Sequence, residues 1–300
     1  QKGEYHGEYL SYYENTSFNP SMNKDNNPWE GKIKTVYTYV NGQKTGVHKE
    51  YDKYENLVIE EELKDGVRNG FYKRYENGKV KVEGTYLNDK KEGLYTVHKS
   101  DNFKDVFTFS NGLKNGLYKN YYGDVVIKCG TYSNDLIEGE WKEFDNSGNI
   151  FLESAYLNDT LNGVYKKYKG EVVIEEGQYS NGLMTGSWKE YNNQGVLTKD
   201  YSYFEDRLEG SYKKYSGNIT VEKGQYSNGL MTGKWVFRYP NGNKKAEGEY
   251  VNGNGTDNGI KGSSISSPGI PKNGRDGVWT IHHDNGIEYE MAIWDEGRVL

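Results

Sequence analysis

Among the residue types that could do chemistry, lysine has the most regular spacing in this 300-residue chain. One lysine per period stands three residues after a recurring glycine, and such a ladder of cations could follow a polyanion or an acidic strip on a partner. Glu50, Glu143 and Glu190 each follow one of these lysines and partly neutralise it. Phosphate binding needs clustered, uncompensated positive charge, so we interpret the lysines as a solvated face. They are Lys49, Lys73, Lys119, Lys142, Lys166, Lys189 and Lys213.

Nucleophilic and metal chemistry is poorly supported. Cys129 is the single cysteine, and no neighbouring base is suggested that would activate it. His282 and His283 are adjacent, so on a strand they point to opposite faces and cannot easily chelate one metal. The acidic run 60–62 would indicate glycosidase chemistry only if it flanked a cleft, and we interpret it as solvated. We therefore predict no enzyme activity, no metal and no cofactor.

Composition limits the class of protein. The chain carries 38 Lys and Arg against 44 Asp and Glu, a net charge of −6, and this acidic balance argues against general nucleic-acid binding. It has no run of 18 apolar residues, so no transmembrane span is predicted. Aromatic residues make up 15% of the chain, which is too many for a disordered protein. Tyrosine suits a thin structure because its ring can be buried while its hydroxyl stays in water.

A repeat must position these residues. Glycines that stand two residues before an aromatic recur every 23 or 24 residues from Gly46 to Gly233. Longer steps before Gly46 and after Gly233 indicate two inserted loops, at 14–30 and 254–274. We assign the recurring glycines and tryptophans as structural anchors. They are Gly70, Gly93, Gly116, Gly139, Gly163, Gly186, Gly210, Gly233, Trp141, Trp188, Trp235 and Trp279.

Each period reads as two strands joined by tight turns. Asn77-Gly78, Asn241-Gly242 and Asn285-Gly286 fall between strand-like segments, and Asn-Gly supplies the two positive φ angles of a type I′ hairpin. Asn181-Gly182 and Asn252-Gly253 mark the second turn of their periods. We predict an all-β fold, an elongated single-sheet, solenoid-like array of about eleven stacked β-hairpins that runs continuously over residues 1–300, with little or no helix.

A second aromatic usually follows the first by three residues, as Tyr75 follows Tyr72 and Tyr191 follows Trp188. An odd offset places the two rings on opposite faces of an ideal strand. Either both faces carry aromatic ladders, or each strand bends before its end. The sequence leaves both possibilities open.

The segment Gly177-Gln178-Tyr179-Ser180-Asn181-Gly182 followed by Gly186, which recurs from Gly224 to Gly233, resembles the MORN repeat (membrane occupation and recognition nexus). The additional Gly-x-Trp/Tyr-x-x-Tyr strand is similar to a bacterial variant of that repeat, found in proteins often described as antitoxin-like. The resemblance covers nearly the whole chain and implies stacked hairpins in a long twisted sheet. It also implies membrane-lipid binding, protein scaffolding or dimerisation as functions, by analogy alone. No concentrated basic patch supports lipid binding.

We expect a non-catalytic scaffold or adaptor that holds another protein, for example as an accessory subunit of a cell-envelope complex. The alternatives are an antitoxin or immunity protein and a carbohydrate- or lipid-binding module, with peripheral association with a membrane or envelope. Because Gln1 is compatible with signal-peptide cleavage, export to the cell envelope is favoured over a cytoplasmic location. Loops carry function more often than the scaffold beneath them, so most candidate contacts lie in the insertions. The candidates are Phe18, Met22, Trp29, Ile265, Pro268, Ile270, His282 and His283.

Overall fold

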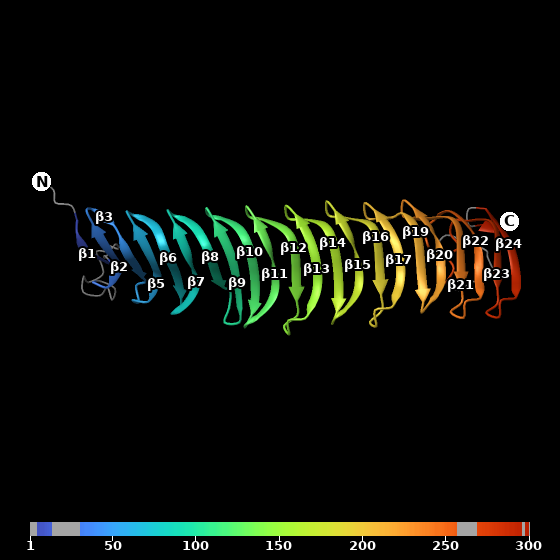
Figure 1. Ribbon diagram of the computed structural model, residues 1–300, viewed down its shortest axis with the longest axis horizontal. Coiled ribbons are helices and arrows are strands. Elements are labelled where there is room, and N and C mark those ends of the chain that lie inside the picture. The colour runs from blue at the N-terminus through green and yellow to red at the C-terminus, as the bar shows by residue number, and fades with distance from the viewer. Residues whose placement is uncertain (1–4, 14–30, 257–268, 296–297, 300) are drawn as a thin grey trace, which may run out of the picture. The chain divides into compact units, whose positions relative to one another are not determined.

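A computed structural model describes residues 5–13, 31–256, 269–295 and 298–299, and every regular element in that part of the chain is a β-strand (Figure 1). The chain divides into two compact units. Unit 1 holds residues 1–139 and 144–148, and unit 2 holds residues 140–143 and 149–300, so the boundary falls inside β12 (Leu136–Phe144). Within each unit, the strands pair antiparallel with their neighbours along the chain, which confirms the prediction of an all-β array of consecutive hairpins.

The strands of unit 1 precede β12. They are β1 (Gly7–Tyr12), β2 (Ile33–Val40), β3 (Gln43–Lys44), β4 (Gly46–Tyr51), β5 (Leu57–Lys64), β6 (Val67–Glu76), β7 (Lys79–Leu87), β8 (Lys90–His98), β9 (Phe103–Ser110), β10 (Leu113–Tyr122) and β11 (Val125–Ser133).

The strands of unit 2 follow β12. They are β13 (Ile150–Leu157), β14 (Thr160–Lys169), β15 (Val172–Ser180), β16 (Leu183–Tyr191), β17 (Leu197–Phe204), β18 (Arg207–Leu208), β19 (Gly210–Ser216), β20 (Ile219–Ser227), β21 (Leu230–Arg238), β22 (Lys244–Gly253), β23 (Arg275–His282), β24 (Glu288–Asp295) and β25 (Arg298–Val299).

The first aromatic of each period lies on one face of the sheet, which we call the aromatic face. In several periods it packs against a glycine on the strand before it: Tyr95 of β8 lies opposite Gly84 of β7. A β-carbon at Gly84 would lie 2.2 Å from the Tyr95 ring, so only glycine leaves room for that ring. The same contact recurs in unit 2 between Gly224 and Trp235, at 2.1 Å. This explains the glycine that opens the Gly-x-Tyr motif.

The anchor glycines serve a different purpose. All of those predicted, from Gly70 to Gly233, have positive φ angles, between 60° and 140°. At most of these positions, such as Gly186 and Gly233, an added β-carbon would have no close neighbour. Backbone conformation rather than crowding therefore selects glycine there.

The Asn-Gly turns divide into two kinds. Asn77-Gly78 and Asn181-Gly182 have two positive φ angles each, as a type I′ turn requires. At Asn241-Gly242 and Asn285-Gly286 only the glycine has a positive φ, so the prediction of type I′ turns is wrong there. Both instead close with a hydrogen bond from the glycine N–H to the carbonyl three residues earlier, which is the type I turn followed by a left-handed glycine. Asn252-Gly253 lies within β22 and forms no such turn.

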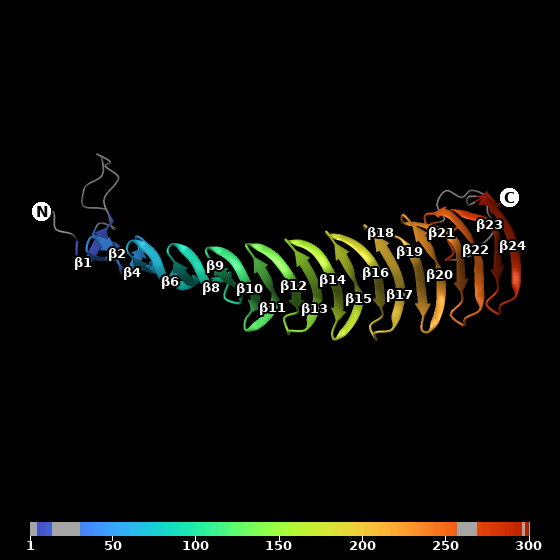
Figure 2. The ribbon, with the colours of Figure 1, turned by 45° about the horizontal axis from the view of Figure 1, so that its top comes forward.

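The second aromatic lies on the face opposite the aromatic face, which we call the lysine face. The Tyr75 hydroxyl donates to Glu60, which lies directly opposite Lys73. A β-bulge falls at the same point, because Arg74 opposes Val82 while Tyr75 opposes Val80. Both faces therefore carry aromatic side chains. Bulges at this place recur along the chain and accompany the bowed strands of unit 2 (Figure 2).

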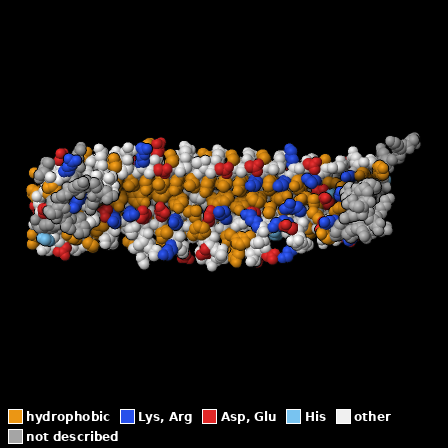
Figure 3. All heavy atoms as spheres, turned by 180° about the vertical axis from the view of Figure 1, so that it is seen from behind, with side chains coloured by type: hydrophobic (Ala, Val, Ile, Leu, Met, Phe, Trp, Pro, Cys, Tyr) orange, Lys and Arg blue, Asp and Glu red, His pale blue; other side chains and the backbone are white. Residues whose placement is uncertain are grey.

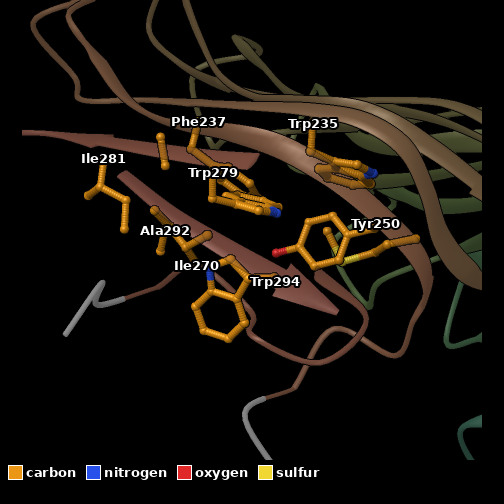
Figure 4. Packing of buried hydrophobic residues seen from close by; sticks show 10 residues of the cluster. Trp235, Phe237, Tyr250, Ile270, Trp279, Ile281, Ala292 and Trp294 are labelled. Atoms are coloured by element: carbon orange, nitrogen blue, oxygen red, sulfur yellow. The ribbon is translucent and has the colours of Figure 1, made fainter. Parts of the chain in front are cut away.

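The largest buried cluster lies in the last hairpins of unit 2. Trp235, Trp279 and Trp294 are its largest members, and Tyr250 packs edge-on against Trp279 with ring centroids 5.0 Å apart (Figure 4). A smaller cluster in unit 1 contains Tyr95 and Phe109. The aromatic rows thus supply the core that a single-layer sheet otherwise lacks.

Candidate functional site

The predicted lysines form a row along the lysine face, in which acids on neighbouring strands lie opposite Lys49, Lys73, Lys166 and Lys189, whereas Lys119 lies opposite Val106 and Cys129. In unit 1, Lys49 lies opposite Glu60, Glu60 opposite Lys73, and Lys73 opposite Glu83. The Lys49 ammonium is 3.2 Å from the Glu60 carboxylate. In unit 2 the same alternation runs through Glu153, Lys166, Glu176, Lys189 and Asp200.

Counter-charge on the lysine face therefore comes from the adjacent strands. Glu50 and Glu190 follow their lysines directly in the chain, so they point to the other face. The row is one of opposite charges directly across from each other, which stabilises strand pairing by a few tenths of a kcal/mol or more per pair. Such a row forms a neutral polar surface without a concentrated field for a polyanion.

Tyrosines of the lysine face hold these acids in place. Tyr168 donates to Glu153 at 2.7 Å and Tyr191 donates to Glu176 at 2.6 Å. Burial and the hydrogen bond to a carboxylate raise the pKa of Tyr168 and of Tyr191 to about 12. Cys129 occupies the position that an acid holds in other repeats, half-buried and opposite Lys119.

Hydrophobic side chains also reach solvent from the lysine face of unit 1. Leu94 and Leu117, each one residue after an anchor glycine, are 66% and 61% exposed. Threonines lie across from them, Thr108 opposite Leu94 and Thr131 opposite Leu117. We call Phe71, Leu94, Leu117 and the threonines between them the apolar row.

A shallow hollow of about 310 Å³ opens beside this row. Phe71 and Leu94 line it, with Gly84 and Thr85 between them and Lys73 among the polar residues at its border. Its lining comes from β6, β7 and β8, three consecutive strands whose register is fixed by pairing. An apolar side chain of a partner could enter it while charged groups remain at the edge.

A buried polar cluster in unit 1 was not predicted. His48 occupies a position that holds an aromatic in the other complete repeats, and its Nδ1 lies 2.9 Å from Glu61 Oε1. The Arg68 Nε donates to Glu61 Oε2 at 2.6 Å, and Tyr37 stacks on the His48 ring at 4.2 Å. Glu61 is only 6% exposed, so the interpretation of residues 60–62 as solvated is wrong for Glu61. The replacement of an aromatic by histidine was the signal available in the sequence.

Opposing effects set the charge state of Glu61. Burial raises the pKa of its carboxyl, but hydrogen bonds from His48 and Arg68 outweigh this and hold the pKa below its usual range. The carboxylate is therefore ionised at neutral pH and joins β4, β5 and β6 through side chains. This arrangement is structural: His48 fills the space that a tyrosine or tryptophan fills in other repeats, and Arg68 and Glu61 pair beside it.

The predicted contact residues have different surroundings. Phe18, Met22, Trp29, Ile265 and Pro268 lie outside the described residues. Ile270 is 1% exposed and packs into the tryptophan cluster, so its side chain faces the protein's own core (Figure 4).

The two adjacent histidines lie apart from any common site. The His282 side chain is 12% exposed, and its Nε2 lies 3.8 Å from Glu288. The His283 residue is exposed, and its N–H donates to the Ile287 carbonyl across the turn.

Figure 3 shows one face of the molecule, on which hydrophobic side chains gather in a band bordered by charged ones of both signs. Among the described residues, no group of three or more His, Cys, Asp or Glu side chains is placed to hold a metal ion. The same residues contain no helix long and apolar enough to cross a membrane. The chain matches no family model and no curated protein sequence.

Proposed function

We propose that the protein is a non-catalytic scaffold that binds another protein through the apolar row of unit 1. The observation that carries this proposal is the exposure of Leu94 and Leu117, together with the hollow that Phe71 and Leu94 line. Contiguous exposed apolar surface with a polar border is typical of protein–protein contact sites.

The rest of the lysine face fits this role. Lys73 and Glu83 lie opposite each other beside the apolar row, so this part of the lysine face forms a polar rim without a strong net charge. Strand pairing and the stacked rings on the other face hold the surface rigid before binding, which lowers the entropy lost on association. The resemblance to the MORN repeat supports a repeat scaffold of this kind, and supports an envelope-associated complex by analogy.

The test is a tagged pull-down from separated soluble and membrane fractions of the native cell, comparing two double variants. Leu94→Ser with Leu117→Ser removes the apolar row, and the fold tolerates serine there because Ser187 and Ser211 occupy the same position in other repeats. Leu157→Ser with Phe204→Ser removes exposed apolar area from unit 2 as the matched control.

We expect a stoichiometric protein partner that the first variant loses and the control keeps. Retention by both variants would move the binding site away from the apolar row. A small toxin as the sole partner would establish the antitoxin alternative instead. The absence of any protein partner would reject the scaffold and favour glycans or lipids.

A further inference from the structure

One position of the repeat is basic in four consecutive periods of unit 1. It is the residue two before each anchor glycine, at the start of the strand that carries the first aromatic. In unit 1 four consecutive periods hold a basic residue there, Lys44, Arg68, Lys91 and Lys114, and Ile137 follows them; unit 2 holds Leu161, Met184, Leu208 and Met231, and then Arg275. We call the four basic residues of unit 1 the cation row.

Each member of the cation row lies over rings of the aromatic face. The Lys91 Nζ is 4.2 Å from the centroid of Tyr95 and 4.8 Å from that of Phe109. The Lys114 Nζ is 4.7 Å from Phe107 and 4.9 Å from the Tyr132 centroid. Lys44 lies 3.4 Å from the ring centroid of Tyr37, and Arg68 lies over Tyr72 and Tyr86. The rings attract the cations, and Lys44, Lys91 and Lys114 are half-buried residues that remain partly accessible to solvent.

Three of these cations have little counter-charge. Arg68 forms its ion pair with Glu61, but no acidic group of the described chain lies within 4.0 Å of the Lys44, Lys91 or Lys114 ammonium. Burial, and then the charge of Lys114, lower the pKa of Lys91, while the charge of Asp135 raises it, so the repulsion between the lysines is only partly offset. This contrasts with the neutralised row on the lysine face, and an added anion would relieve the repulsion.

Spacing limits the shape of the ligand. Successive members of the cation row are two strands apart, which is about 10 Å at a strand separation of about 4.8 Å. A polyproline II helix has three residues per turn and rises about 9 Å in that turn, so every third side chain points the same way at nearly this interval. In an extended β-strand, every third side chain instead alternates between faces.

The rings favour the same conformation. Tyr86, Phe107 and Tyr132, which the cations contact, are half-buried residues and so remain partly accessible to solvent. Proline-rich segments in the polyproline II conformation bind to such aromatic surfaces because little conformational entropy remains to be lost.

We propose that the aromatic face of unit 1 binds an extended acidic segment of a partner protein, in the polyproline II conformation, with a carboxylate at every third residue against the cation row. The segment runs across the strands, along the row. This site lies on the face opposite the apolar row and does not depend on the scaffold proposal.

The experiment measures binding of a fluorescent peptide of four Glu-Pro-Pro repeats to the full chain by anisotropy at low salt. A peptide of the same composition with its four glutamates contiguous tests spacing. The variant Lys44→Met, Lys91→Met, Lys114→Met removes three cations, and Met184 and Met231 show that methionine fits this position. The matched control Lys49→Met, Lys73→Met, Lys119→Met removes the same charge from the lysine face.

We expect the spaced peptide to bind about tenfold more tightly than the clustered one, and the cation-row variant to lose about tenfold in affinity, as three exposed ion pairs would give. The control should bind within about twofold of the parent, since its lysines lie on the other face. Equal losses in both variants, or equal binding of both peptides, would reject the site. Tighter binding of heparin or of phosphatidylserine vesicles, lost in the cation-row variant, would reassign it to a polysaccharide or a membrane.

Discussion

The indole of Trp188 lies flat against the backbone of Gly177, so close that a β-carbon at residue 177 would lie 2.2 Å from indole Cδ2. Each occurrence of this pair joins two periods, because the glycine belongs to the last strand of one period and the ring to the first strand of the next. The stability of the array therefore depends on a repeated close approach of ring and main chain.

Gly177→Ala should lower the free energy of unfolding of unit 2 by about 2 kcal/mol, because the added methyl group forces the Trp188 ring out of its position. Urea unfolding monitored by tryptophan fluorescence measures this. The double variant with Trp188→Leu tests the cause, since a smaller side chain should recover much of the loss caused by Gly177→Ala. If the two changes were simply additive, the ring would not be the source of the strain.

Gly186→Ala should also destabilise unit 2, by about 1 kcal/mol, but for a conformational reason. Its φ is 64°, and a β-carbon there would meet only the Gln178 side chain at 3.8 Å. Asparagine tolerates this region better than alanine, so Gly186→Asn should lose less stability than Gly186→Ala. The same urea titration compares them, and an equal loss for both would contradict a conformational origin.

Arg275→Lys should loosen the segment 269–274 and lower stability by about 3 kcal/mol, because lysine cannot reproduce two hydrogen bonds from one buried guanidinium. Arg275 lies between Trp279 and Trp294, with centroids 4.6 Å and 4.7 Å away, and donates to the carbonyls of Ile270 and Pro271 at 3.0 Å. Hydrogen exchange of residues 269–274 should rise. Unchanged protection there would show that the guanidinium does not hold the segment.

Glu61→Gln should destabilise unit 1 by about 2 kcal/mol at pH 7, because His48 and Arg68 lose a charged acceptor. The folded-state pKa of Glu61 lies below its unfolded value, so the carboxylate stabilises the fold above about pH 4.3 and loses this effect as the pH falls through the folded pKa. The difference between parent and variant should thus shrink below about pH 4.

Urea midpoints measured from pH 7 to pH 3 test the role of Glu61, with the exposed Glu62→Gln as the control. A difference between parent and Glu61→Gln that stayed constant with pH would show that ionisation of Glu61 does not contribute.

The periodic glycines and aromatics were sufficient to predict the hairpin array, since positive φ and ring stacking are local requirements that recur in every period. The turns at Asn241 and Asn285 were mispredicted because the same dipeptide fits a two-residue turn or the end of a longer one, and flanking residues such as Pro240 decide. Pairing of Lys73 with Glu60 and Glu83 depends on register between strands, which sequence order does not give.

Burial of Ile270 could not be predicted either. An isoleucine in a Gly- and Ser-rich stretch is typical of a loop, and its position depends on the buried Arg275, which binds the carbonyls beside it. The basic residues of the cation row are visible in the sequence, but the kind of ligand they could bind depends on which face of the sheet they occupy. Only the rings beneath Lys91 and Lys114 show that it is the aromatic face.

The alternation of charge on the lysine face also restricts how the array can change in length. β14 and β16 both pair antiparallel with β15 and therefore run in the same direction, so removal of β15 alone would leave two strands that no hairpin turn can join, and would make neighbours of Lys166 and Lys189, which now share Glu176. Removal of β14 and β15 together would instead bring Glu153 opposite Lys189 and restore an attractive pair. Strand direction and charge thus impose the same parity rule, under which evolution or an engineer can shorten or lengthen this part of the protein only by an even number of strands.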